Sequence, residues 1–175
     1  MCTGNRFRSP LAAALFAEEA DELAEVCSLG VLELGPAPAL PEAVDLAETF
    51  GIDLAGHRAR DLAQLNLESF DLVLGFERMH VRAAVVDGFA PIERTFTLPE
   101  LVELLESIPE PSSRHDPVEQ ARNRVAQAHG LRSPDFRSSA VAEIADPLGR
   151  TAREQRRTAH ELQELVGRLA RALFA

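Results

Sequence analysis

The chain has 175 residues, a length that predicts a single domain over residues 1–175 with a core of its own. Its formal net charge of −10 argues against nucleic acid as a partner, because nucleic-acid-binding surfaces are basic. The sequence has two cysteines, no apolar run of membrane length and no signal-peptide pattern. We therefore expect a cytoplasmic protein without membrane contact, and a monomer by default.

The first predicted element is a loop that runs from Cys2 to Arg8 and leads into a helix. Five residues separate the cysteine from the arginine, enough for their backbone N–H groups to curl around one centre as an anion nest closed by the arginine fork. Ser9 and Pro10 have the pattern of a helix N-cap and a first helical position, and an alanine-rich helix is predicted over residues 10–25. The positive end of that helix and Arg8 both favour a thiolate at Cys2.

Helix and strand patterns alternate along the rest of the chain, as in an α/β domain. Apolar runs predict strands over residues 26–30, 71–76 and 94–97. Helical periodicity predicts helices over residues 41–50, from residue 77 to about 86, 99–108 and 152–173. Gly51 follows the first of these helices in the position of a C′ glycine.

Residues 109–139 differ in composition from the rest of the chain. Pro, Ser, Arg, Asp and His surround a polar helical stretch at about residues 118–129. The segment is too short to bury a core of its own. We therefore predict that it is an insertion on the single domain.

The pattern of Cys2, five residues, Arg8, Ser9 and Pro10 resembles the active-site loop of the low-molecular-weight protein tyrosine phosphatases. That family carries its general acid in an Asp-Pro pair far downstream. Candidates here are Asp116-Pro117, Asp146-Pro147 and the reversed pair Pro134-Asp135. Position favours Asp146, because it follows a short apolar run and precedes the C-terminal helix, whereas Asp116 lies in a polar stretch.

The resemblance implies a role for each part of the loop. Cys2 would be the nucleophile, Arg8 would hold the transferred phosphate, and Asp146 would protonate the leaving group. The implied substrate-binding positions are Thr3, Gly4, Asn5, Arg6, Phe7 and Arg8. The reaction implied in this way needs no metal ion and no organic cofactor.

Two further positions match residues that support the loop in the family. Residues 51–60 resemble a family segment that brings a histidine under the loop, so His57 would hydrogen-bond Asn5. Asn5 would hold a left-handed backbone turn, which asparagine tolerates better than most residues. Ser9 would assist by hydrogen-bonding the sulfur of Cys2.

The family also implies a three-layer α/β/α fold with a parallel four-stranded sheet. Its loop follows a central apolar strand, whereas only Met1 precedes Cys2 in this sequence. We therefore expect the first, central strand to be missing here and the true start of the polypeptide to lie further upstream.

The implied activity is hydrolysis of a phosphate monoester through a phosphocysteine intermediate, most simply on a protein phosphotyrosine. Arg6, Phe7 and Leu148 depart from the family pattern, so the substrate stays open among phosphotyrosine protein, phosphoarginine and a small phosphate ester. One alternative is a non-catalytic phosphate-binding relative. Another is an arsenate reductase, which needs further cysteines where this chain offers only Cys27.

Overall fold

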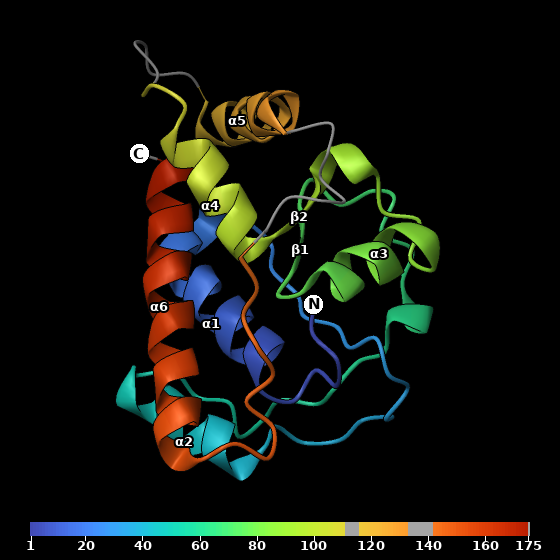
Figure 1. Cartoon of the computed structure of the whole chain (residues 1–175), viewed down its shortest axis with the longest axis vertical. Coiled ribbons are helices and arrows are strands. Elements are labelled where there is room, and N and C mark those ends of the chain that lie inside the picture. The colour runs from blue at the N-terminus through green and yellow to red at the C-terminus, as the bar shows by residue number, and fades with distance from the viewer. Residues whose placement is uncertain (111–115, 133–141, 175) are drawn as a thin grey trace.

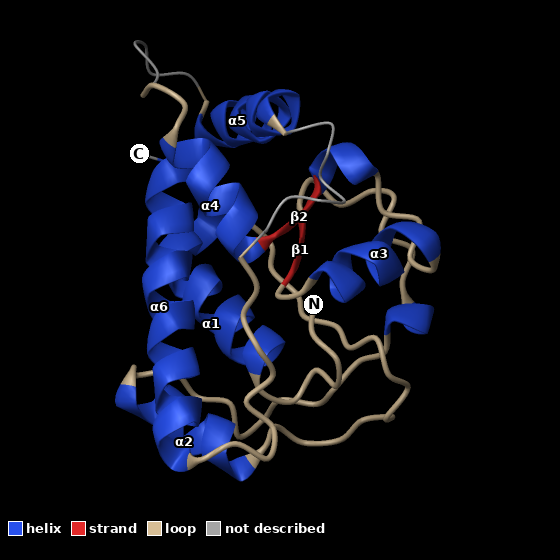
Figure 2. Cartoon of the chain, viewed as in Figure 1, coloured by secondary structure: helices blue, strands red, loops and turns tan. Residues whose placement is uncertain are grey.

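The computed structural model describes residues 1–110, 116–132 and 142–174. Two short strands, β1 (Val73–Gly75) and β2 (Thr95–Thr97), pair in parallel with Leu74 opposite Phe96. In Figure 2 the strands lie between α3 (Arg78–Val86) and α4 (Leu98–Glu106). Parallel strands covered by helices confirm the α/β class predicted from the sequence.

A layer of helices makes up the other side of the molecule. Its members besides α4 are α1 (Arg8–Ala20), α2 (Pro41–Thr49), α5 (Pro117–Leu131) and α6 (Ala152–Phe174). Helix α6 packs against each of them (Figure 1). Its buried leucines recur at helical spacing, as predicted: Leu162, Leu165, Leu169 and Leu173. The described part of the chain also has three short 3₁₀ helices, at Asp21–Leu23, Leu62–Gln64 and Ile92–Arg94.

The sheet is smaller than the four-stranded sheet that the resemblance implied, with two strands among the described residues. The prediction of a strand over residues 26–30 is wrong. Only Gly30 pairs there, in isolated bridges to Cys2 and Asp61. Residues 26–29 and residues 73 and 74 of β1 all line a cavity of about 730 Å³.

Helix α1 differs at both ends from the predicted range of residues 10–25. It begins at Arg8, with Phe7 in the N-cap position and no side-chain cap, so the prediction of Ser9 as the N-cap is wrong. The loop curls directly into the helix, since the N–H of Leu11 already donates to the carbonyl of Phe7 at 3.2 Å. At the other end Asp21 has a φ of 48°, a left-handed conformation that stops the helix.

Helix α2 ends as predicted, at a glycine. Gly51 has a φ of 80° and its N–H donates to the carbonyl of Glu48 at 3.0 Å. The N–H of Ile52 donates to the carbonyl of Ala47, also at 3.0 Å. These two bonds form a Schellman motif, which satisfies carbonyls that the helix end would otherwise leave open.

The predicted insertion lies partly outside the described residues, at positions 111–115 and 133–139. Inside it, α5 packs against α4 and α6 and buries Val125 and Ala128. Asp116 caps this helix by accepting the N–H groups of Val118 and Glu119. The first Asp-Pro pair is therefore a helix start, and the insertion itself stays a prediction.

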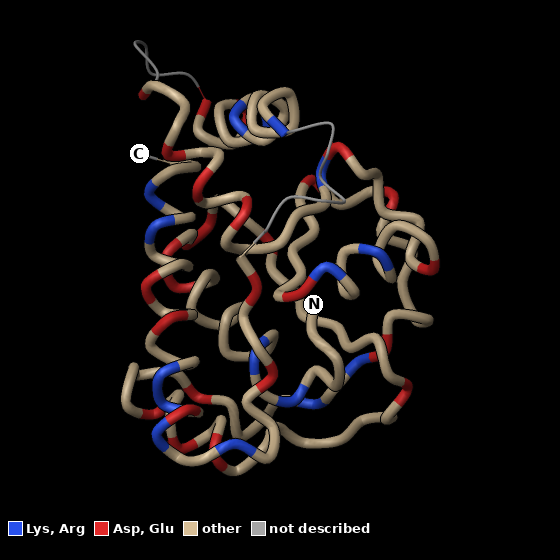
Figure 3. Tube along the Cα trace, in the orientation of Figure 1, with Lys and Arg blue, Asp and Glu red and all other residues tan. Residues whose placement is uncertain are grey.

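Charged residues of both signs are interspersed over the surface, for example along α6 (Figure 3). Among the described residues, no helix is both long and apolar enough to cross a membrane. The same residues hold no group of three or more His, Cys, Asp or Glu side chains placed to bind a metal ion.

Candidate active site

The loop from Cys2 to Arg8 surrounds a buried sulfur at the start of α1. The Sγ of Cys2 accepts the backbone N–H of Asn5 at 3.2 Å and lies 3.0 Å from the Oγ of Ser9. The hydroxyl of Ser9 is thus engaged with the loop, which explains why it does not cap α1. The N–H of Asn5 and the N-terminus of α1 put partial positive charge beside the sulfur.

Asn5 holds the loop in shape through its backbone and its side chain. Its φ of 51° is left-handed, and its Nδ2 donates to the hydroxyls of Ser9 and Ser28 at 2.8 Å each. Its Oδ1 accepts the N–H of Arg60 at 2.9 Å. The Nε2 of His57 lies 2.7 Å from the backbone carbonyl of Asn5. Burial lowers the pKa of His57, so the ring is neutral and donates from Nε2 to this carbonyl.

Arg8 is the most enclosed charge of the site, with 1 % of its surface exposed. Its Nη1 donates to the carboxylate of Glu77 and, at 2.8 Å, to the carbonyl of Ile144. Its Nη2 donates to the Oγ1 of Thr3 at 3.2 Å and lies 2.8 Å from the Oδ2 of Asp146. The structure thus brings Asp146, of the second Asp-Pro pair, to the arginine of the loop, although Arg8 and Asp146 are 138 positions apart in the sequence.

Two residues of the site were missed by the sequence analysis, Glu77 and His80 at the start of α3. They form a capping box, in which the Glu77 side chain accepts the N–H of His80 and the His80 Nδ1 accepts the N–H of Glu77 at 3.1 Å. The Nε2 of His80 lies 3.2 Å from the Oγ1 of Thr3. A Glu-x-x-His spacing directly after a buried strand was the available signal.

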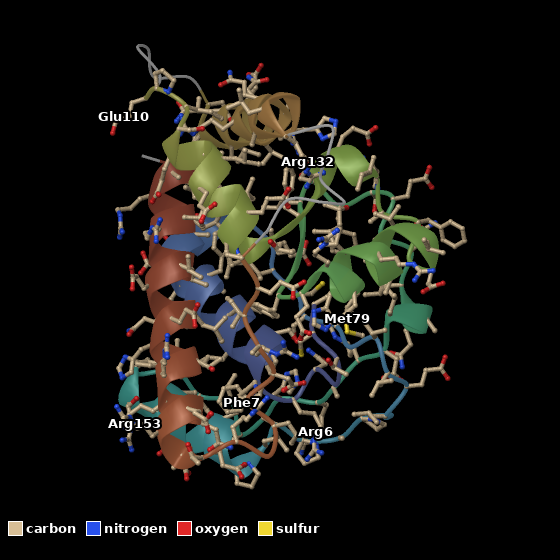
Figure 4. The ribbon with its side chains drawn as sticks, viewed as in Figure 1. Arg6, Phe7, Met79, Glu110, Arg132 and Arg153 are labelled. Atoms are coloured by element: carbon tan, nitrogen blue, oxygen red, sulfur yellow. The ribbon has the colours of Figure 1, made fainter. Side chains whose placement is uncertain are left out.

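Among the described residues, Arg6, Phe7, Leu34 and Leu148 bear on which substrate the loop accepts. Phe7 is a core side chain with 4 % of its surface exposed, so only its backbone can face a ligand. Arg6 lies near the lower edge of the molecule in Figure 4, and its Nε donates to the carbonyl of Pro38 at 2.8 Å. Leu34 covers Gly4, where an added Cβ would lie 3.0 Å from its Cδ1. Leu148 follows the Asp-Pro pair with 65 % of its surface exposed.

A buried cysteine that accepts a backbone N–H at a helix N-terminus, in a loop that ends at a buried arginine, has the arrangement of a cysteine-based phosphate-binding site. The family model described as "Low molecular weight phosphotyrosine protein phosphatase" matches residues 1–128. The chain belongs to this family, which confirms the resemblance found in the sequence.

Curated relatives carry two kinds of name. A probable low molecular weight protein-tyrosine-phosphatase, EpsP of Ralstonia solanacearum, is 35% identical over 86 residues, which are 47% of this chain and 59% of that protein. The match to EpsP of Ralstonia nicotianae covers 50% of its length, so the chain spans about half the length of these two relatives. The protein-arginine-phosphatase of Bacillus subtilis (strain 168) is 28% identical over 99% of this chain and 93% of its own.

Solved structures agree on the fold. The low molecular weight protein tyrosine phosphatase from T. tengcongensis superposes with a TM-score of 0.67 at 28% identity, over 96% of this chain and 92% of that one. The YwlE arginine phosphatase from Geobacillus stearothermophilus superposes with a TM-score of 0.70 at 27% identity, over 97% of this chain and 87% of that one. The α/β fold of the family is therefore confirmed.

Proposed function

We propose that this protein hydrolyses phosphate monoesters through a phosphocysteine intermediate on Cys2, with protein phosphotyrosine as the leading substrate. One observation carries the proposal: a single loop encloses the sulfur of Cys2 and connects it, through the buried Arg8, to the carboxylate of Asp146. Membership of the family supports it, because relatives are named as protein-tyrosine-phosphatases.

In the proposed reaction the thiolate of Cys2 attacks phosphorus in line with the leaving oxygen. Arg8 and the N–H groups of the loop hold the three equatorial oxygens and balance their charge. Asp146 gives its proton to the leaving oxygen, and the resulting carboxylate then takes a proton from the water that hydrolyses the phosphocysteine. The hydroxyl of Ser9, 3.0 Å from the sulfur, stabilises the thiolate that leaves in this second step.

The pairing of Arg8 with Asp146 gives substrate binding a defined first event. The guanidinium of Arg8 already has partners for both Nη atoms, namely two carboxylates, a carbonyl and a hydroxyl. A phosphate dianion that enters the loop replaces the carboxylate of Asp146 on this guanidinium. Asp146 is partly exposed, so its displaced carboxylate takes up a proton from solvent before it protonates the leaving group of the substrate.

Phosphoarginine is the second candidate substrate. The match to the Bacillus subtilis protein-arginine-phosphatase covers 99% of this chain, whereas the match to EpsP of Ralstonia solanacearum covers 47%. Leu34, beside Gly4 of the loop, and the exposed Leu148, two residues after Asp146, are aliphatic and offer no ring on which a phenyl group would stack.

The test is to assay one preparation on an aryl phosphate, a phosphotyrosine peptide and a phosphoarginine peptide. We expect Cys2→Ser to abolish turnover of every substrate, and Asp146→Asn to slow it by roughly 100-fold. Cleavage of the phosphoarginine peptide alone would replace the leading substrate. Vanadate binding without turnover would overturn the proposal in favour of a non-catalytic relative, and thiol-dependent reduction of arsenate would do so in favour of an arsenate reductase.

A further inference from the structure

The hydroxyl of Thr3 receives a hydrogen bond from a histidine whose tautomer is fixed. The backbone N–H of Glu77 donates to the Nδ1 of His80 at 3.1 Å, so Nδ1 is an acceptor and carries no proton. Burial, with Arg8 nearby, lowers the pKa of His80 to about 3, so the ring is neutral at physiological pH. Its one proton therefore sits on Nε2, which donates to the Oγ1 of Thr3 at 3.2 Å.

The same hydroxyl oxygen also accepts from Arg8, whose Nη2 lies at 3.2 Å. A threonine hydroxyl has two acceptor lone pairs and one proton to donate. Both lone pairs are now occupied, so the rotation of the hydroxyl is restricted and its proton points away from both donors. Within the described residues Thr3 Oγ1 has no further hydrogen-bond partner, so this proton remains available to a ligand.

We propose that Thr3 donates its hydroxyl proton to a phosphate oxygen of the substrate, and that His80 is the positioning residue that aims it. This inference rests on the proposed function and assigns a further ligand contact within the same site. Thr3 follows Cys2 directly, and its hydroxyl accepts a hydrogen bond from Arg8. The hydroxyl therefore belongs to the anion loop, which runs from Cys2 to Arg8, rather than to a separate site.

The fold leaves His80 no alternative position. Its side chain is fully buried at the junction of β1 and α3. It packs over Gly75, the last residue of β1, where an added Cβ would lie 2.8 Å from the Cβ of His80. His80 thus packs against Gly75, accepts the N–H of Glu77 in the capping box and donates to Thr3. Such a support is what a precisely aimed donor requires.

Paired substitutions separate the hydroxyl from its support. Thr3→Val removes the hydroxyl and should weaken inhibition by inorganic phosphate roughly tenfold, whereas Thr3→Ser should keep wild-type inhibition. His80→Asn retains an acceptor near the position of Nδ1 but loses the Nε2 donor, so we expect part of the same loss. His80→Gln places an amide donor near the position of Nε2 and should restore phosphate binding. In the Thr3→Val background, His80→Asn should add nothing further.

Thermal unfolding of each variant controls for general loss of structure. Val81→Ala, at a buried neighbour on α3 that contacts neither Thr3 nor Arg8 by hydrogen bond, should lower stability without changing inhibition by phosphate. Wild-type phosphate inhibition in Thr3→Val would overturn the inference. So would full additivity of Thr3→Val and His80→Asn, because a purely structural histidine would act independently of the hydroxyl.

A binding readout keeps this inference distinct from the proposed function. Inorganic phosphate should protect Cys2 from alkylation by iodoacetamide, with a midpoint that rises about tenfold in Thr3→Val. If the wild-type protein shows that protection and no turnover, the phosphatase proposal fails and the role of Thr3 stands. If turnover is present and phosphate protects Thr3→Val with the same midpoint as wild type, the phosphatase proposal stands and the role of Thr3 fails. Absence of protection in the wild-type protein would overturn both.

Discussion

The anion loop and the cavity beside β1 are neighbours with opposite packing. In the loop, the buried polar side chains of Asn5, Arg8 and Ser9 all have hydrogen-bond partners. The cavity, of about 730 Å³, is lined mainly by apolar side chains. Ser9 and Ser28 border both regions. The shape of the loop is therefore set by hydrogen bonds and one left-handed residue, rather than by close packing of the space behind it.

Asn5→Ala should have the largest effect on the free energy of unfolding, because it removes the side chain that hydrogen-bonds the loop to its surroundings. It leaves the N–H of Arg60 and the hydroxyls of Ser9 and Ser28 without their partner, and we expect a loss of about 2–4 kcal/mol in the free energy of unfolding by urea. Asn5→Gly is the matched control, since it removes the same amide but accepts the positive φ. Equal stability of Asn5→Ala and wild type would show that this network does not hold the loop.

The pH dependence of stability tests how firmly the loop is tied to α3. The pKa of His80 is about 3 in the folded protein and 6.5 ordinarily, so the unfolded chain binds the extra proton between these values. The free energy of unfolding should therefore fall as pH drops from about 6.5 toward 3, with this residue contributing up to ~1.4 kcal/mol per pH unit. Urea unfolding of His80→Gln should show a flatter dependence than wild type. Parallel curves would contradict the assignment.

Leucine substitutions at two alanines test whether the region around the cavity is more loosely packed than the core. Ala43 on α2 is fully buried in the core, whereas Ala13 on α1 lines the cavity. Ala43→Leu should lower the free energy of unfolding by about 1–3 kcal/mol through overpacking. Ala13→Leu should leave it unchanged or raise it by up to ~1 kcal/mol, because its methyl groups enter open space. Equal losses in thermal unfolding would mean that the cavity does not accept side chains.

Ser28→Ala should have the smallest effect, at the border of the two regions. Asn5 loses one acceptor but keeps its bonds to Ser9 and Arg60, so we expect a loss of about 1 kcal/mol. Inhibition by inorganic phosphate should remain at the wild-type level, measured beside the thermal unfolding midpoint. A large loss of phosphate binding would show that the loop depends on the wall of the cavity.

The features that the sequence predicted well are local ones. The C′ position of Gly51 and the leucine spacing of α6 each follow from the conformational rules of a few neighbouring residues. The choice of Asp146 over Asp116 rested on position alone. The structure pairs Asp146 with Arg8 and gives Asp116 a capping role, and the role of Asp146 as the general acid stays a prediction.

What the sequence did not predict depends on distant partners. His80 belongs to the site because it hydrogen-bonds Thr3, 77 positions away in the sequence. Glu77 belongs to it because it accepts a hydrogen bond from Arg8, 69 positions away. Neither contact leaves a local pattern beyond that of a helix cap. At residues 26–30 the error is the reverse, because a local strand pattern is present and the strand is not. These residues have the composition of a strand, but a strand also requires a paired neighbour, and within this segment only Gly30 pairs, in isolated bridges.

Gly75 has a consequence for how this protein tolerates sequence change. Because an added Cβ there would lie 2.8 Å from the Cβ of His80, positions 75 and 80 behave as one unit of variation. A library that randomises position 75 alone should yield glycine among its active members. Alanine should become acceptable at position 75 only where position 80 becomes glycine, because every other residue keeps a Cβ there, and such clones should lose the hydroxyl alignment at Thr3 together with the histidine.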